Sequence, residues 1–498
     1  MNKETTNIWK DKAISRSKEI KNLNKELIRQ KNRAESWRTK AKISYKDSLS
    51  KDLVIKELSS KKEAAYRSES VQKVGTYRYH PRVMQLCVQL YKSGLSLRQV
   101  SSVISFIGLF LGRSLAAPSH SIISIWVHKV GLGLLKKGQQ EFRDSREQWS
   151  LIIDESFSLG KSRLLIILGI RLSSLQQGRI RALEVVPLVI KSQEHWKSAD
   201  ISACISDICR NFKGNIAYVT SDKGTNLLGS YEQKNLNHVP DWAHYGANIL
   251  EKIYVKEADF KEFNEKMGAF KRKRKQSIYT HYVPPNLSVK VRFMNYIPFL
   301  EWANIMVANF KRIPAEIKPE LAFLVTLRPF IEEMSALFYT VQDIGLLLKT
   351  QGINPETYGL AMQKLNKLDQ DHSNSSKAAI LRQATEDYFK KTLEIYYEYI
   401  KKQDKNTPFF DGIVATSEIL ECLFGKLKHR SDKNPKRGFS GNSLLIPLFC
   451  NELEEIDTLN ALQDIDCKAL EKWKNKNICN RNYKSFRNIF KKKRGRKK

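Results

Sequence analysis

The chain has 498 residues, which is too many for a single small core and predicts two to four structural units. It carries 86 Lys and Arg against 52 Asp and Glu, a formal charge of +34 that indicates a polyanionic partner such as nucleic acid. No apolar run approaches the roughly 18 residues of a membrane span, so we expect no membrane segment and no signal peptide. Seven scattered cysteines without a Cys-x-x-Cys pair fit a reducing compartment without structural zinc.

Residues 1–75 predict a basic helical region with weak coiled-coil character. Residues 7–64 contain neither Gly nor Pro, and small or apolar residues recur there at intervals of seven. The repeat is interrupted at three equivalent sites. Self-association or a basic helix along DNA is one interpretation, and a solvated helix is the other. The repeat residues are Ala13, Ile20, Leu27, Ala34 and Ala41.

Residues 76–140 predict three short helices with apolar cores. The second begins with a capping box, since Ser96 can cap the amide of Gln99 and Gln99 can bond back. The third begins at residues 118–119 and is expected to bury Ile122, Ile123 and Trp126. This order resembles a helix-turn-helix domain that reads DNA, and a packing unit without DNA contact is the alternative. The expected outward-facing DNA contacts are Ser119, His120, Ser121, Ser124 and Lys129.

Residues 148–255 predict a mixed sheet. Runs at 149–154, 164–172 and 182–190 read as a three-strand meander, followed by a helix at 199–212, a fourth strand at 216–221, an extended segment at 237–242 and a helix at 244–255. Three antiparallel strands, a helix, a parallel strand and a helix are the order of the ribonuclease H-like fold. We expect this domain to be the first part of a catalytic unit.

Residues 256–412 predict an all-helical domain inserted into that sheet domain, with helices broken at several prolines. Residues 413–462 then return to the catalytic domain, and residues 463–498 form a basic tail. The fold class is therefore multidomain α+β. Five consecutive cations in the insertion favour DNA contact over a solvated loop: Lys271, Arg272, Lys273, Arg274 and Lys275.

Three acids are candidates for one metal site. Asp154 and Asp222 each follow a short apolar run, in strands that would lie side by side. Glu421 lies on a predicted helix with Lys428 two turns later, and Glu418 is a rival one turn before it. Carboxylate oxygens suit Mg²⁺ or Mn²⁺, and two such ions can activate a water or a 3′-hydroxyl and stabilise the leaving oxygen of a phosphodiester.

The residues 152–156 (IIDES), 220–224 (TSDKG) and the Glu421-x6-Lys428 spacing together resemble a DDE transposase. The Glu-to-Lys spacing is similar to that of bacterial insertion-sequence transposases, in which the Lys contacts transposon-end DNA, although Val414 and Ser417 replace the upstream Tyr and Arg of that signature. Asp241-x-x-His244 and a long helical insertion before the Glu resemble hAT transposases. The resemblance implies that His244 lies near the scissile phosphate as a hydrogen-bond donor or proton carrier. A helix-start histidine bonded to Asp241 is the alternative.

We therefore expect a transposase that binds terminal repeats of double-stranded DNA and performs Mg²⁺-dependent cleavage and strand transfer. The family implies a dimer or higher oligomer, and a bacterial host with a cytoplasmic, nucleoid-associated protein fits the insertion-sequence likeness. Two alternatives stay open. One is a noncatalytic DNA-binding regulator, and the other is a ribonuclease H-like nuclease without strand transfer.

Overall fold

The computed structural model describes residue 35 and residues 79–110, 117–159, 162–175, 178–286, 293, 295–372, 375–402, 410–431 and 441–479. The chain separates into two compact units, Met1–Lys73 and Val74–Lys498. Within the first unit only Glu35 is described, so the predicted coiled coil lies outside the described residues. Among the helices that the structure describes, none is both long enough and apolar enough to cross a membrane.

The second unit begins with three helices, α2 (Pro81–Ser93), α3 (Leu97–Phe110) and α4 (His120–Asp144). Gly94 ends α2 with a φ of 135°, a left-handed conformation that favours glycine. The predicted capping box is confirmed, because the Gln99 amide donates to Ser96 Oγ at 3.3 Å and the Ser96 amide donates to Gln99 Oε1 at 2.8 Å. Local sequence therefore sets the start of α3.

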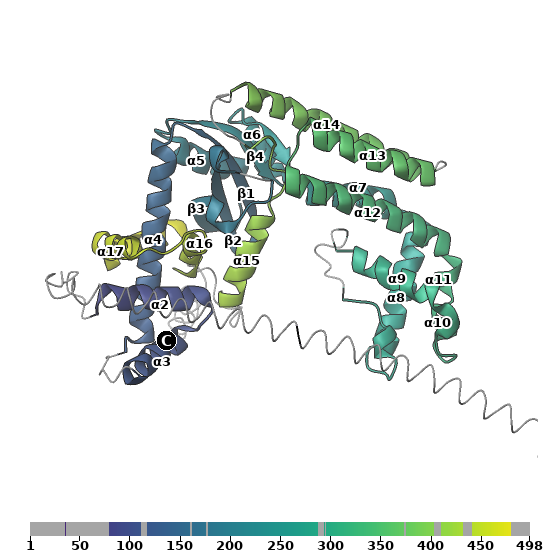
Figure 1. Cartoon of the computed structure of the whole chain (residues 1–498), viewed down its shortest axis with the longest axis horizontal. Coiled ribbons are helices and arrows are strands. Elements are labelled where there is room, and N and C mark those ends of the chain that lie inside the picture. Colours follow the sequence, from purple (N-terminus) through teal and green to yellow (C-terminus); the bar gives the residue numbers. More distant parts are fainter. Residues whose placement is uncertain are drawn as a thin grey trace, which may run out of the picture. The chain divides into compact units, whose positions relative to one another are not determined.

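A five-stranded mixed sheet in the order β3-β2-β1-β4-β5 forms the centre of the unit (Figure 1). The strands are β1 (Gln148–Leu159), β2 (Ser162–Arg171), β3 (Val185–Gln193), β4 (Asn215–Ser221) and β5 (His238–Pro240). β1 pairs antiparallel with β2 and parallel with β4, and β2 pairs antiparallel with β3. The meander and the parallel fourth strand were predicted from the apolar runs, and both are present.

Helices cover both faces of the sheet. On one face, α5 (Ser198–Cys209) and α6 (Thr225–Glu232) pack on β1 and β4 through a compact apolar cluster that includes Ile153, Ile205 and Tyr231. The other face carries Ile152 and Ile166 and packs against helices that include α4 and α15 (Glu418–Ser431). α6 was not expected from the sequence, because its polar composition does not show a clear apolar stripe.

The remaining helices follow β5 in the chain. α7 (Trp242–Tyr254), α8 (Ala258–Arg274), α9 (Ile297–Ala308), α10 (Lys318–Leu321) and α11 (Phe323–Thr326) come first. The long helices α12 (Arg328–Gln351), α13 (Pro355–Asp371) and α14 (Ser376–Lys401) complete the block between the sheet and α15 (Figure 1). The predicted helical character of this block is confirmed, and no strand is found among its described residues.

The C-terminal part is helical. A 3-10 turn (Gly441–Leu444) is followed by two helices, α16 (Leu445–Phe449) and α17 (Glu455–Asp464). Within the predicted basic tail, α18 (Cys467–Asn477) is a further helix, capped by the Asp466 carboxylate, which accepts from the Ala469 amide at 2.6 Å. Residues 480–498 lie outside the described residues.

Candidate functional site

Asp154 lies on β1, and Asp222 directly follows Ser221, the last residue of the parallel strand β4. Ile152 of β1 pairs with Thr220 of β4, and Asp154 and Asp222 each come two positions after these paired residues. Since adjacent strands are about 4.8 Å apart, this pairing brings the two aspartates to the same end of the sheet. Asp154 is buried, and Asp222 is partly buried.

The prediction that Asp154 ends the first strand is wrong. β1 continues to Leu159, and Asp154 itself pairs with Ile166 of β2. The register shifts between Asp154 and Phe157, so an irregularity follows the aspartate directly. The strand continues through residues 157–159, where apolar and polar residues alternate. The prediction did not include them because it followed only the apolar run at 149–154.

Buried Asp241 forms hydrogen bonds to three elements near these aspartates. Its backbone amide donates to Ser221 O of β4 at 2.9 Å. Its Oδ1 caps α7 by accepting from the amides of Ala243 at 2.8 Å and His244 at 3.2 Å. Its Oδ2 accepts from both the amide and the hydroxyl of Ser417 at 2.6 Å each, immediately before α15. Asp241 therefore fixes the starts of α7 and α15 beside the end of β4.

Two further bonds hold the segment before α15 against the sheet. Thr220 Oγ1 donates to Val414 O at 2.8 Å, and the Val414 amide donates to the buried Tyr218 hydroxyl at 3.1 Å. The Trp242 amide also donates to Ala415 O at 2.9 Å. The first turn of α15, which carries Glu421, is thus placed by bonds between residues far apart in the chain.

His244 and Glu421 face each other across this junction. His244 Nε2 lies 4.0 Å from Glu421 Oε1, with side-chain exposures of 32% and 54%. The imidazole is therefore directed toward Glu421, while the backbone amide of His244, rather than its ring, bonds to Asp241. Both groups are accessible to a ligand, and both belong to the same region as Asp222.

The carboxyl groups of this region repel one another. Burial raises the pKa of Asp222, His244 counters that shift, and the Asp241 charge adds to it. Burial likewise raises the pKa of Glu421, with His244 opposing and Asp241, Glu418 and Asp222 reinforcing the rise. The Asp222 charge therefore acts on Glu421, and His244 and Asp241 act on both carboxyl groups. A cation bound there would reverse this repulsion.

Glu155 is a further acid of this region that the sequence did not single out. Burial raises its pKa, Arg163 and Asn226 oppose the rise, and the Asp222 charge adds to it. Its Oε2 is buried and has no hydrogen-bond partner among the described residues. The IIDES sequence offered a signal, because two adjacent acids at the end of an apolar run are uncommon, but adjacent strand residues point to opposite faces.

The charges of three of these acids affect the pKa of one buried phenol, that of Tyr231. Tyr231 on α6 donates to Ser221 Oγ at 2.9 Å. Burial raises the pKa of Tyr231, the Ser221 bond lowers it, and the charges of Asp222, Asp154 and Glu155 raise it further. Asp154, Glu155 and Asp222 therefore lie within electrostatic reach of one buried hydroxyl.

The groups of the region are carboxylate oxygens, which are the ligands that a hard divalent cation prefers. Across the part of the chain that the structure describes, however, no three His, Cys, Asp or Glu side chains lie close enough together to hold a metal ion as they stand. Asp154, Asp222 and Glu421 share a region without forming a closed three-ligand cluster.

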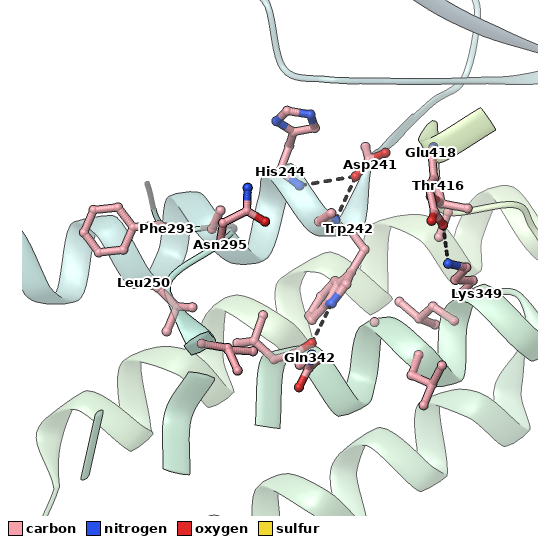
Figure 2. Close-up of a pocket in the computed structure, with 18 of the residues that line it drawn as sticks. Asp241, Trp242, His244, Leu250, Phe293, Asn295, Gln342, Lys349, Thr416 and Glu418 are labelled. Carbon is pink, nitrogen blue, oxygen red and sulfur yellow. Dashed lines mark hydrogen bonds and ion pairs between the residues drawn. The ribbon is translucent and has the colours of Figure 1, made fainter. Parts of the chain in front are cut away.

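A pocket of about 400 Å³ is lined in part by Glu421 and His244. Figure 2 shows His244, Trp242 and Glu418 among its lining side chains. Its interior is mostly apolar and lies between α7, α12 and the start of α15, and Trp242 donates to Val341 O of α12 at 3.0 Å across it. Glu418 forms an ion pair with Lys349 at its edge. The rival acid is therefore already paired with a lysine, whereas Glu421 faces His244.

The predicted DNA-facing side of the third helix is only partly as expected. His120 and Ser121 are exposed, Ser119 is the exposed N-cap residue of α4, and Ser124 is partly exposed. Lys129 is instead buried, with 4% exposure, so its assignment as a DNA contact is wrong. Ile122 was expected in the core and is 37% exposed. Lys129 is buried because α4 is 25 residues long and other elements pack against it along much of its length.

The cation run at 271–275 is not a loop. It forms the last turn of α8 and the residue after it, where cations favour the negative end of the helix dipole. Lys273 bonds Glu320 at 2.8 Å, Arg274 bonds the same carboxylate, and Lys271 bonds Pro285 O. Arg272 and Lys275 are exposed and have no such bond among the described contacts, so they are the members of the run best placed for DNA.

The end of α15 carries two different cations. Lys428 is exposed, two turns after Glu421 on the same helix. Arg430 instead donates to Leu95 O at 2.9 Å and to Tyr91 O, and its guanidinium lies 4.9 Å from the Tyr91 ring centroid. Arg430 therefore links the Glu421 helix to the α2–α3 turn, a role that no local sequence signal indicates.

No protein-family model matches the chain, and no curated protein matches it. Among solved structures, a similar chain belongs to the Drosophila P element transposase strand transfer complex, with 11% sequence identity and a TM-score of 0.43. The match covers 83% of this chain and 100% of that chain.

Proposed function

We propose that the protein is a DDE-type transposase with a ribonuclease H-like catalytic domain interrupted by the α8–α14 helices. The observation that supports the proposal is the parallel pairing of β1 and β4 two residues before Asp154 and Asp222, together with the effect of the Asp222 charge on Glu421. Three antiparallel strands followed by a helix and a parallel strand support the fold assignment.

Asp154, Asp222 and Glu421 are the residues that would hold Mg²⁺ or Mn²⁺. When bound, two such ions supply an activated water or 3′-hydroxyl and stabilise the leaving oxygen of a phosphodiester. Glu421 is half-exposed on the first turns of α15, so its side chain can turn toward Asp222 without unfolding the helix. The region would then close only when its cation and DNA arrive.

The other residues of the site orient DNA. His244 lies 4.0 Å from Glu421, so its ring can donate a hydrogen bond to a phosphate oxygen near that carboxylate. Lys428 extends the same helix face toward the DNA backbone as a point charge. Asp241 does not touch DNA in this scheme, and it is a positioning residue that keeps His244 and Glu421 at one junction.

The proposal also includes binding of terminal repeats by the α2–α4 region and assembly as a dimer or higher oligomer on paired DNA ends. The outward His120 and Ser121 and the positive charge of the chain support DNA contact there. A bacterial, nucleoid-associated setting is part of the same proposal and follows from the insertion-sequence likeness of the Glu421-x6-Lys428 spacing.

The test is incubation of the purified protein with DNA that carries the sequences flanking its gene, in Mg²⁺ and in EDTA. Nicking followed by joining to a second DNA supports a transposase. Nicking without joining supports a nuclease of the same fold, and binding without breakage supports a noncatalytic regulator. The last two outcomes each contradict the proposed strand transfer.

A further inference from the structure

A second pocket, of about 540 Å³, lies where α4, β3, α5 and α18 meet. None of the acids of the candidate site lines it. β3 is an edge strand of the sheet, and Gln139 of α4 donates to its Leu188 O at 2.7 Å, so α4 covers the edge beside the pocket. The pocket is therefore a separate concave feature on the side of the sheet away from β4 and β5.

The charge of this pocket is strongly positive. Asp207 is the one acid among its lining residues, and Arg210 already pairs with that carboxylate at 3.1 Å. Cations converge here from α4, β3 and α18 and from the residue that follows α5, which favours an anionic ligand with more than one charge. The lining cations are Lys136, Arg143, Lys191, Arg210, Lys472 and Lys476.

One lining cation has a donor that the protein leaves unused. Arg143 donates from its terminal nitrogen to Gln140 Oε1 at 3.1 Å, but its Nε is buried and has no hydrogen-bond partner among the described residues. A buried unpaired donor is unfavourable, so this guanidinium keeps hydrogen-bonding capacity that the described residues do not use.

The same pocket offers apolar and aromatic surface. Trp473 of α18 is partly exposed and lines it together with Leu188 and Ile208. The phosphates of a DNA duplex lie on a convex surface, and its paired bases are stacked on one another. An unpaired nucleotide combines a charged phosphate with a flat base that can stack on an aromatic ring.

We propose that this pocket binds a single strand of DNA, with phosphates on Lys472, Lys476 and Arg143 and a base against Trp473. The choice of DNA rests on the proposed function, whereas the pairing of phosphate with an unpaired base rests on the pocket.

The test is fluorescence anisotropy of a labelled twelve-nucleotide oligo-dT with the full chain in EDTA, where no cleavage can occur. We expect Lys472→Glu with Lys476→Glu to weaken binding at least tenfold and Trp473→Ala to weaken it about tenfold. Trp473→Phe, which keeps a ring, restores most of the loss. Circular dichroism confirms that each variant is folded.

The matched control is Lys367→Glu with Lys390→Glu, the same charge change at exposed positions of α13 and α14 that do not line the pocket. Equal losses in the two double variants, or an unchanged affinity for Trp473→Ala, would overturn the proposal. The proposal would also be overturned if the variants lost as much affinity for a DNA duplex as for oligo-dT. Binding of oligo-U by a protein that does not bind oligo-dT would overturn it as well. Failure of DNA breakage in Mg²⁺ leaves these binding results unchanged, so the two proposals fail separately.

Discussion

Replacing Asp241 by Asn tests the junction that positions the candidate site, because the two side chains have nearly the same shape. The Asp241 carboxylate is 2% exposed and accepts four hydrogen bonds, two from the start of α7 and two from Ser417. The amide oxygen of Asn can keep the α7 pair, but its NH₂ group then faces the Ser417 amide. Losing one charge-assisted bond and weakening a second should destabilise the junction by about 3 kcal/mol.

Hydrogen exchange measures this change locally. Since about 1.4 kcal/mol corresponds to a factor of ten, the amides of residues 414–421 should exchange roughly a hundredfold faster in Asp241→Asn if they open with the junction. Cleavage of DNA should fall while DNA affinity stays near that of the unaltered protein. Asp466→Asn is the matched control, because Asp466 caps α18 through one bond at an exposed position and Asn caps helices as well as Asp. Unchanged exchange at 414–421 would refute the proposed clamp.

Three further substitutions give expected outcomes of different sign. Burial and like charge raise the pKa of Asp222 in the folded protein. Its ionisation therefore destabilises the folded protein as the pH rises from the unfolded-state pKa of about 3.9 through that raised pKa. In thermal unfolding, Asp222→Asn should be more stable than the unaltered protein at pH 7 but not below about pH 3.9. Arg430→Ala should lower stability by about 3 kcal/mol through the lost carbonyl bonds and ring contact, with exchange increasing around residues 91–95. Lys428→Ala should leave stability within about 0.5 kcal/mol and weaken binding to end-containing DNA in a gel-shift titration. A stabilised Arg430 variant, a destabilised Asp222 variant or undiminished DNA binding would each contradict its prediction.

Local patterns predicted much of the fold. The capping box of Ser96 and Gln99 is set by residues three apart, and the meander and the parallel strand follow from short apolar runs with polar turns. Such features depend on neighbours in the chain, so the sequence alone carries them. The parallel pairing of the two strands that lead to Asp154 and Asp222 follows from the same strand pattern.

Features that depend on distant contacts were not predictable in the same way. The Asp241–Ser417 bonds join residues 176 positions apart, and nothing near either residue indicates the other. Lys129 was expected at the surface because helical periodicity does not show which side of a long helix other elements cover. The helical cation run at 271–275 was likewise assigned to DNA contact without knowledge of Glu320, which pairs with two of its members.

The central claim is that Asp154, Asp222 and Glu421 hold divalent cations together. Electron paramagnetic resonance of Mn²⁺ counts bound ions without requiring activity, and it can be measured with and without DNA. The account predicts saturable binding that weakens at least tenfold in Asp154→Asn, Asp222→Asn and Glu421→Gln, falls as pH drops through the raised pKa values of Asp222 and Glu421, and is retained in Glu418→Gln. Identical Mn²⁺ binding by all of these proteins would contradict it.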